Sequence, residues 1–488
     1  MILTKLFEFY ILFILVRSSI SKFNKISSDD CPLSCTCQFN ITTLTINSCT
    51  RRQVVKRLPN NFKKYKNLEN VKILIASHNF IQGISNYLFE NYTNLEKLIL
   101  NSNEINEIPI GVFDNLFKLN SVNLSYNSIQ LINSKTFQNL TNLLKLHLGQ
   151  NQISNIHKDA FAGLKNLVHL NIYGNNLTSI AENIFTDLEN LEGLFLHSNS
   201  ITDLAEDLFK DLKKLKTLSI HTNKIKSLKN STFRGLYKLE SLASAMNEIE
   251  EIDSGTFADL ISLKFLYLQK NQIKLLRSNF LFKNLVRLEK IYLEKNNISV
   301  IPRGLFDEHL INLSFIKLSY NLLSEIELWP LLLPNIEKID ISFNNISKFT
   351  NKFNWLFLNS SSISRINKTI DLSNNFIDAF DDQVIQQYGV CNSKQYELFI
   401  GSYLNGFLLA NNPIDCDCNT SMRLISETRI LLKNRFSLRG SNIFKSKCSN
   451  SPFDGKSILE FSDCAEYPLK NFECLNTTKV ITVKGKSK

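Results

Sequence analysis

The chain has 488 residues, of which 43% are hydrophobic, and carries a formal net charge of +11 at pH 7. After the first residues, no segment reaches the roughly 18 consecutive apolar residues that a membrane-spanning helix needs, so no membrane span is expected. In an exported protein, this positive charge favours glycosaminoglycans or acidic surfaces over nucleic acid as ionic partners.

The first 21 residues have the organisation of a secretory signal peptide. Lys5 supplies positive charge, residues 9–16 form an apolar run, and Ser19 and Ser21 fit a small-x-small cleavage site. The apolar run is too short to span a bilayer. Residues 1–21 are therefore predicted to be a signal peptide, and the protein is predicted to be secreted into the extracellular space.

Four cysteines follow this segment. Cys31, Cys35 and Cys37 lie in CPLSCTC, and Cys49 comes shortly after them. A zinc site is the competing interpretation, but the single residue between Cys35 and Cys37 is a narrower spacing than structural zinc sites usually have, and such sites occur in reducing compartments. Disulfide bonds are therefore expected here, and neither a metal site nor a cofactor is predicted.

A series of asparagines then recurs along most of the chain. The first nine are 24 residues apart and the later gaps are less regular: Asn79, Asn103, Asn127, Asn151, Asn175, Asn199, Asn223, Asn247, Asn271, Asn296, Asn321, Asn344, Asn375 and Asn412. A fixed period of this size is typical of a solenoid, in which each coil buries its apolar edge against its neighbours.

Apolar residues keep a constant register around each asparagine. In residues 95–105, LEKLILNSNEI, leucines at 95, 98 and 100 precede Asn103, and the same frame returns in the following coils. This pattern resembles the leucine-rich repeat, L-x-x-L-x-L-x-x-N-x-L. The resemblance implies an α/β solenoid: a curved horseshoe with a parallel concave β-sheet and disulfide-stapled caps. Residues 68–410 are expected to form about 14 repeats, irregular after residue 346.

Two further features of the repeats make structural predictions. Asparagine offers both a donor and an acceptor, so the stacked asparagines are expected to satisfy the backbone groups of the turns. A phenylalanine recurs about ten residues after most asparagines, and these rings are predicted to stack along the convex side: Phe89, Phe113, Phe137, Phe161, Phe185, Phe209, Phe233, Phe257, Phe282 and Phe306. Ser244 replaces an inward leucine, and a local hydrogen bond is expected to satisfy its hydroxyl.

A second cysteine cluster begins in NNPIDCDC, and the resemblance assigns both clusters to terminal caps. The expected domains are an N-terminal cap at 31–60, a C-terminal cap at 411–474 and a basic tail at 475–488. Sequence alone leaves the connectivity open. The resemblance to the family implies the disulfide pairs Cys31–Cys37, Cys35–Cys49, Cys416–Cys448 and Cys418–Cys464. Cys391 and Cys474 remain and are expected to form a fifth pair.

N-glycosylation sequons recur from end to end of the chain and are consistent with export. They begin at Asn40, Asn91, Asn123, Asn139, Asn176, Asn230, Asn297, Asn312, Asn345, Asn359, Asn367, Asn419 and Asn476. A glycan on Asn123 would obstruct the early part of the concave face. The binding area is therefore expected on the later repeats.

The repeat frame also predicts which side chains point into the concavity. Aromatic residues and histidines gather there: His147, His169, Tyr173, Phe195, His197, His221, Phe265, Tyr267, Tyr292, Phe315 and Tyr320. Outward aromatic residues have no packing role within a coil, whereas aromatic anchors are typical of interaction hot spots. His197 and His221 share a position on successive repeats. A metal site, a pH-sensitive contact and a polar wall are the three interpretations of the histidines.

Basic residues suggest an alternative partner. They cluster near the first cysteines and again in the middle of the chain: Arg51, Arg52, Lys56, Arg57, Lys63, Lys64, Lys66, Lys213, Lys214, Lys216, Lys224, Lys226 and Lys229. Such patches fit heparan sulfate, or they are ordinary solvated surface.

The sequence contains no H-E-x-x-H, P-loop or G-x-S-x-G motif, and a shallow sheet offers no water-excluding cleft, so no catalytic activity is expected. The chain is similar to extracellular leucine-rich repeat proteins with both caps. These include Slit-type repeats, Toll ectodomains, the acid-labile subunit of growth-factor complexes and the non-catalytic subunit of carboxypeptidase N. The resemblance implies binding of an extracellular protein through the concave face. A matrix component that binds heparan sulfate and a non-catalytic carrier subunit remain as alternatives.

Overall fold

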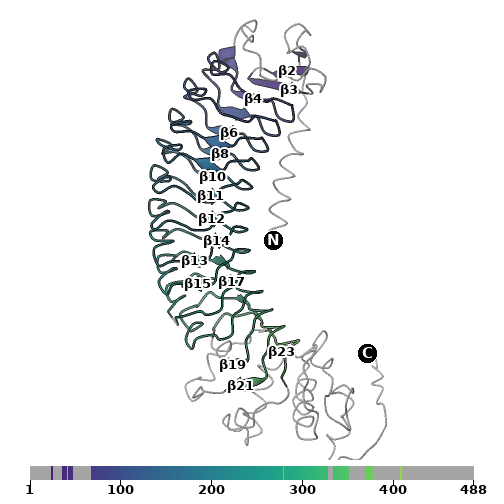
Figure 1. The fold of residues 1–488 in the computed structure, drawn as a ribbon, viewed down its shortest axis with the longest axis vertical. Helices are drawn as coiled ribbons and strands as arrows, with labels where there is room; N and C mark the ends of the chain where they lie inside the picture. The colour runs from purple at the N-terminus through teal and green to yellow at the C-terminus, as the bar shows by residue number, and fades with distance from the viewer. Residues whose placement is uncertain are drawn as a thin grey trace, which may run out of the picture. The chain divides into compact units, whose positions relative to one another are not determined.

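The computed structural model describes residues 24–25, 36–40, 42–47, 68–278, 280–327, 333–350, 369–377 and 407–408. The chain divides into two compact units, one formed by residues 1–201 with 211–215 and the other by residues 202–210 with 216–488. Figure 1 shows strands of both units with their labels. The predicted signal peptide, the basic tail and nine of the ten cysteines lie outside the described residues. Only the backbone of Cys37 is described.

In the first unit, a parallel sheet runs from coil to coil. Its strands are β3 (Thr43–Asn47), β4 (Ile73–Ile75), β5 (Lys97–Ile99), β6 (Ser121–Asn123), β8 (Lys145–His147), β10 (His169–Asn171) and β11 (Gly193–Phe195). β1 (Asn24–Lys25) and β2 (Thr36–Asn40) extend it with antiparallel pairs, β1 to β2 and β2 to β3. On the other side of the coils, β7 (Leu131–Ile132) pairs with β9 (Asn155–Ile156).

The second unit repeats this plan. Its parallel sheet contains β12 (Thr217–Ser219), β14 (Ser241–Ala243), β16 (Phe265–Tyr267), β17 (Lys290–Tyr292), β18 (Phe315–Lys317), β20 (Lys338–Asp340), β22 (Thr369–Asp371) and β23 (Phe407–Leu408). Two further parallel pairs join β13 (Ser227–Leu228) to β15 (Glu251–Ile252) and β19 (Glu325–Glu327) to β21 (Lys348–Thr350).

The predicted solenoid is confirmed. The segments that return from one strand to the next consist of turns rather than α-helices. The only helix of the described residues is a 3-10 turn at Leu68–Asn70. The residues of a 24-residue coil form the strand, the turn that contains the asparagine and the return segment that contains the phenylalanine. Too few consecutive positions remain to complete the three or so turns of an average α-helix.

The asparagine ladder is confirmed, and Asn151 is representative of it. Its Nδ2 donates to the carbonyl oxygens of Leu124 and Leu148, both at 3.0 Å, and its Oδ1 accepts the amide N–H of Ile129 at 3.1 Å. One side chain thus satisfies backbone groups of its own coil and of the preceding coil. Buried backbone groups without partners are costly, which explains why asparagine recurs here.

A second asparagine ladder runs along the outside and was not predicted. In each unit, the Nδ2 of an asparagine near the start of one coil's strand segment donates to a backbone carbonyl of the preceding coil, at 2.6–2.9 Å. The donors are Asn94, Asn142, Asn166 and Asn190 in the first unit and Asn312 and Asn335 in the second. The recurring Asn-Leu or Asn-Ile dipeptide at this position was the available signal.

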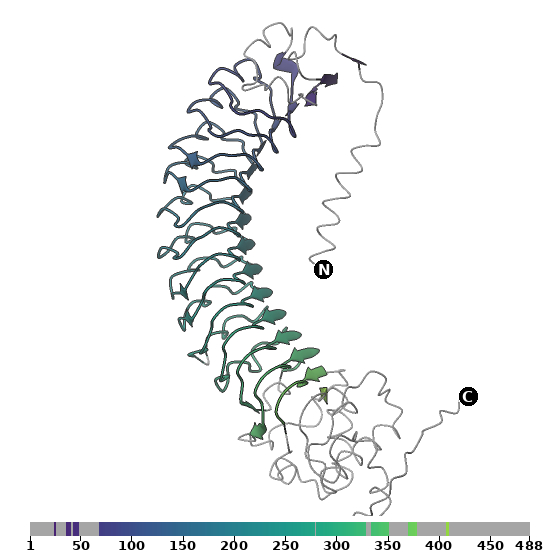
Figure 2. The same ribbon diagram turned by 45° about the vertical axis from the view of Figure 1, so that its right-hand side comes forward.

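The phenylalanine stack is confirmed within each unit, and its spacing shows which side is concave. Centroids of neighbouring rings are 5.8–6.3 Å apart from Phe89 to Phe161 and 5.6–6.4 Å apart from Phe209 to Phe306. Neighbouring strands are only about 4.8 Å apart. The coils of each unit therefore spread on the phenylalanine side, and the sheet lines the inner, concave side (Figure 2).

The prediction of a local hydrogen bond for the Ser244 hydroxyl is wrong. This side chain is fully buried at 0% exposure, and its Oγ has no hydrogen-bond partner among the described residues. The backbone carbonyl of Ser244 is already used, since it accepts the amide Nδ2 groups of Asn247 and Asn271. The surrounding positions are inward apolar side chains, so nothing nearby accepts the hydroxyl proton.

Candidate functional site

The strand side of the first unit presents His147, His169, Tyr173, Phe195 and His197, all half-buried as the repeat frame predicts. Each lies beside an inward residue that is fully buried, for example Leu146 and Leu194. The alternation of the strands therefore positions these side chains on the concave face.

Tyr173 is the centre of this face. Its ring stacks on the His197 ring with centroids 4.8 Å apart and an interplanar angle of 8°. Its hydroxyl lies 3.1 Å from the hydroxyl of Tyr126, two strands away. The intervening strand allows this reach because it carries Gly149, where a Cβ would lie 2.5 Å from the Tyr173 ring.

A second glycine makes room in the same way. A Cβ on Gly193 would lie 2.8 Å from Nδ1 of His169 and 3.1 Å from the ring of Phe195. The Phe195 ring in turn meets the His197 ring edge to face, with centroids 6.4 Å apart. Gly149, Gly193 and Tyr126 thus belong to the face, and the sequence reasoning missed all three.

Tyr126 was missed because it follows the strand rather than lying in it. It has a φ of 57° and is 54% exposed. The equivalent residue of most coils also has a positive φ, including Lys295, Tyr320 and Phe343. This left-handed conformation costs about 1–2 kcal/mol for a residue other than glycine, and it turns the side chain onto the rim of the face.

His147 predicts a pH effect on stability. Burial lowers the pKa of His147 below its ordinary value of 6.5, and the charges of Lys145 and His169 lower it further. Between this lowered pKa and 6.5, the unfolded chain binds more protons than the folded chain, so stability falls as pH drops below about 6.5. We expect His147→Asn to weaken this decline, measured by urea unfolding at several pH values, with pH 8 as the baseline for the substitution itself. Equal pH dependence of parent and variant would contradict the expectation.

The second unit carries a continuous aromatic surface on neighbouring strands. Tyr267 stacks on Tyr292 with centroids 4.9 Å apart, and Tyr292 meets Phe315 at 5.3 Å. Phe265 lies beside them on β16, and all four side chains are half-buried. The aromatic residues therefore pack on one another rather than standing apart, and we call these four residues the aromatic surface.

The phenols of this surface remain protonated donors at neutral pH. Burial raises the pKa of Tyr267, and the neighbouring Tyr292 raises it further. Burial likewise raises the pKa of Tyr292, with a contribution from the charge of Glu294. Ionising either phenol would place a negative charge in a partly desolvated position.

Unmet acceptors lie next to these tyrosines. Oε1 of Gln269 and Oε2 of Glu294 are buried and have no hydrogen-bond partner among the described residues. Oε1 of Glu294 lies 3.6 Å from Nζ of Lys317, on the next strand. Beyond Lys317, Tyr320 stacks on Phe343 at 4.3 Å, and Nζ of Lys295 lies 5.2 Å from the Tyr320 ring.

The histidine pair expected at His197 and His221 falls on the boundary between the two units. His197 belongs to the first unit and His221 to the second. Burial lowers the pKa of His221. Within the described ranges, no group of three or more His, Cys, Asp or Glu side chains is arranged to hold a metal ion.

The described sequon asparagines differ in accessibility. Asn91, Asn176, Asn230, Asn297, Asn312 and Asn345 are exposed, and Asn123 and Asn139 are half-buried. Oδ1 of Asn123 accepts the amide N–H of Ser125 at 3.0 Å. The sequons at Asn359, Asn367, Asn419 and Asn476 lie outside the described residues, and of Asn40 only the backbone is described.

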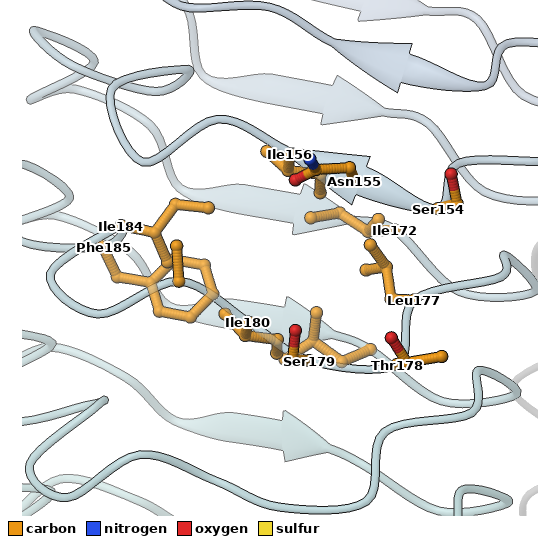
Figure 3. A pocket seen from close by; sticks show the side chains of 12 residues that line it. Ser154, Asn155, Ile156, Ile172, Leu177, Thr178, Ser179, Ile180, Ile184 and Phe185 are labelled. Carbon is orange, nitrogen blue, oxygen red and sulfur yellow. The ribbon is translucent and has the colours of Figure 1, made fainter.

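A cavity of about 320 Å³ opens on the flank of the first unit (Figure 3). Ile156, Ile172 and Phe185 contribute apolar walls, and hydroxyls of Ser154 and Thr178 also line it. The outer strand pair ends at β9, and the next coil does not continue it. The cavity thus lies between the coil that contains β9 and the next coil, where the outer strand pairing stops.

No helix among the described residues is both long and apolar enough to cross a membrane.

Family comparisons agree with the repeat frame. The leucine rich repeat model matches residues 69–129, 117–177 and 286–346, and the BspA type leucine rich repeat region model matches residues 154–281. No curated protein matches the chain.

Solved structures share the fold at low sequence identity. The glycosylated Toll–Spatzle complex of Drosophila contains a chain with a TM-score of 0.61 and 20% identity, over 80% of this chain and 48% of that one. This protein thus spans about half the length of that chain. The leucine-rich repeat domain of APL1B has a TM-score of 0.50 and 20% identity, over 70% of this chain and 87% of that one. Because the coils, both asparagine positions and the family matches coincide over most of residues 69–346, the chain belongs to the leucine-rich repeat family.

Proposed function

We propose that this chain is a secreted, glycosylated leucine-rich repeat protein whose concave face binds an extracellular protein. Cysteine caps at 31–60 and 411–474 belong to the same proposal. The role is recognition rather than catalysis. Leucine-rich repeat proteins generally bind other proteins, and the Toll chain with this fold was solved in complex with Spatzle.

The observation that carries the proposal is the aromatic surface. Tyr267, Tyr292 and Phe315 form an unbroken run across three neighbouring strands. Aromatic side chains give large contact area for little loss of conformational entropy, and Tyr is enriched among the residues that dominate binding energy. The phenol groups of Tyr267 and Tyr292 add hydrogen-bond donors that can fix a partner's orientation.

A partner can be identified by affinity capture with the full chain followed by mass spectrometry. We then expect the triple substitution Phe265→Ala, Tyr267→Ala and Tyr292→Ala to weaken its binding by about 30-fold or more, since hot-spot residues contribute at least about 2 kcal/mol. Calorimetry or surface plasmon resonance would measure the change.

A matched control is available in the same unit. Tyr237, Ile261 and Val286 are exposed apolar residues that precede the strands, at 47%, 46% and 43% exposure. Their triple alanine variant should bind the partner like the parent. Full affinity in the aromatic-surface variant, or loss only in the control, would reject the concave face as the binding site.

Heparan sulfate is the second candidate, favoured by the exposed side chains of Lys224, Lys226 and Lys229 in the second unit. If it is the ligand, the full chain should be retained on heparin and released at modest salt. The aromatic-surface variant should then be retained like the parent. Flow-through at low salt would discard this candidate.

A further inference from the structure

Two lysines flank the apolar centre of the second unit's face. Lys290, Phe315 and Lys338 occupy the same register position on β17, β18 and β20, because Lys290 pairs with Phe315 and Phe315 pairs with Lys338. With neighbouring strands about 4.8 Å apart, the two lysine positions are about 10 Å apart. The Phe315 ring lies between them and contacts Tyr292.

Among the described residues, neither lysine forms an ion pair. Other lysines form the neighbouring ion pairs. Nζ of Lys264 lies 2.9 Å from Oε2 of Glu240, and Nζ of Lys317 lies 3.6 Å from Oε1 of Glu294. Asp340 lies beside Lys338 in the chain, but its Oδ1 accepts both the amide and the hydroxyl of Ser342, at 3.1 and 2.6 Å. Glu294 and Asp340 thus each already contact another residue through one carboxylate oxygen.

Most of the charged side chains around these two lysines are also positive. Lys270 and Lys295 occupy the positive-φ rim positions after β16 and β17. On the face from β16 to β20, five lysines therefore oppose two acids: Lys270, Lys290, Lys295, Lys317 and Lys338 against Glu294 and Asp340. The equivalent strand positions of β12 and β14 carry no charge, since they are Thr217, Ser219, Ser241 and Ala243.

Resting on the proposed function, we infer that the partner docks through an acidic segment in which an aromatic or aliphatic side chain is flanked by carboxylates. The apolar side chain packs on Phe315 and Tyr292, and the carboxylates meet Lys290 and Lys338. Complementary charge selects such a segment and speeds its association. A basic segment would meet like charges at both lysines, which disfavours it.

Random peptides displayed on phage and selected on the immobilised full chain provide the probe. We expect the selected peptides to be enriched in Asp and Glu next to aromatic or aliphatic residues. The double variant Lys290→Glu, Lys338→Glu should bind them about tenfold or more weakly, because two attractive contacts become repulsive. Peptides resynthesised with Lys in place of those acids should regain affinity for the double variant, which a merely structural effect of the substitutions would not produce.

A matched charge reversal serves as the control. Lys238→Glu with Lys283→Glu changes two exposed lysines of the same unit that lie outside its strands, and it should leave peptide affinity unchanged. Selected peptides without an excess of acids, or with equal affinity for the parent and for Lys290→Glu, Lys338→Glu, would overturn the inference while leaving the proposed function standing. Peptides that bind the aromatic-surface variant as well as the parent would instead count against the proposed function. Heparin bound by the parent and lost in the double variant, with no peptide selected, would overturn the inference in favour of a polysaccharide.

Discussion

Replacing Phe137 with alanine is expected to lower the free energy of unfolding of the first unit by about 3–5 kcal/mol, the usual cost of deleting a buried ring. Phe137 is fully buried at 0% exposure. Its ring centroid lies 5.8 Å from that of Phe113 and 6.3 Å from that of Phe161. The substitution therefore removes contacts from two neighbouring coils as well as its own.

Urea unfolding followed by circular dichroism would measure this loss. Hydrogen exchange of amides in residues 113–161 would locate it, because repeat arrays lose stability around the altered coil. Phe117→Ala is the control, since Phe117 belongs to the same unit but is 56% exposed. A change within about 0.5 kcal/mol is expected there. Equal losses in the two variants would mean that the phenylalanine stack does not hold the coils together.

Asn151→Ala is expected to cost a similar amount, about 3–5 kcal/mol. It leaves the amide of Ile129 without its side-chain partner, and it removes one of the two asparagine donors from each of the carbonyl groups of Leu124 and Leu148, which keep those of Asn127 and Asn175. The unpaired buried amide costs about 1–3 kcal/mol, and each of the two lost hydrogen bonds costs about 0.5–1.5 kcal/mol more. The coil before Asn151 is affected as much as its own coil, because the ladder bridges them.

The adjacent residue supplies the control for Asn151. Gln152 is exposed, so Gln152→Ala should change the free energy of unfolding by less than about 0.5 kcal/mol. Asn151→Asp tests the mechanism, since aspartate keeps an acceptor for Ile129 but lacks the donors for the two carbonyl groups. It should be destabilised nearly as much as the alanine variant. An aspartate variant as stable as the parent would show that the donated hydrogen bonds contribute little.

The solenoid was predictable because its constraints repeat. The period of the asparagines, the alternation of inward leucines and the recurring phenylalanine each describe a position that every coil must fill in the same way. Strands such as β5 and β6 therefore appear where the pattern expects them. Even the longer coil that delays Phe282 by one residue keeps its ring in the stack.

The candidate site was predictable in position but not in geometry. The frame places Tyr173 and Tyr267 on the concave face, yet it cannot show that Gly149 opens the space in which Tyr173 reaches Tyr126. That contact depends on the size of a residue on the strand between them. The rim conformation of Tyr126 and the contact of Lys317 with Glu294 also depend on three-dimensional neighbours that the period does not encode.

Ser244 shows the limit of reasoning by analogy between coils. A serine at an inward position usually finds a nearby acceptor, because a buried hydroxyl without one is costly. Here the carbonyl group of Ser244 itself accepts two asparagine amides of the ladder, and the hydroxyl has no partner among the described residues. Which acceptors remain available could be established only from the whole set of hydrogen bonds.

Hydroxyl-radical footprinting of the free full chain would test most directly whether the strand side presents an open aromatic surface. Tyr267, Tyr292 and Phe315 should be oxidised readily, whereas Phe257, Phe282 and Phe306, buried at 1% exposure or less, should stay protected. If the three strand-side residues were instead as protected as the buried phenylalanines in the absence of any partner, the concave face would be covered by the chain itself and could not be the recognition surface.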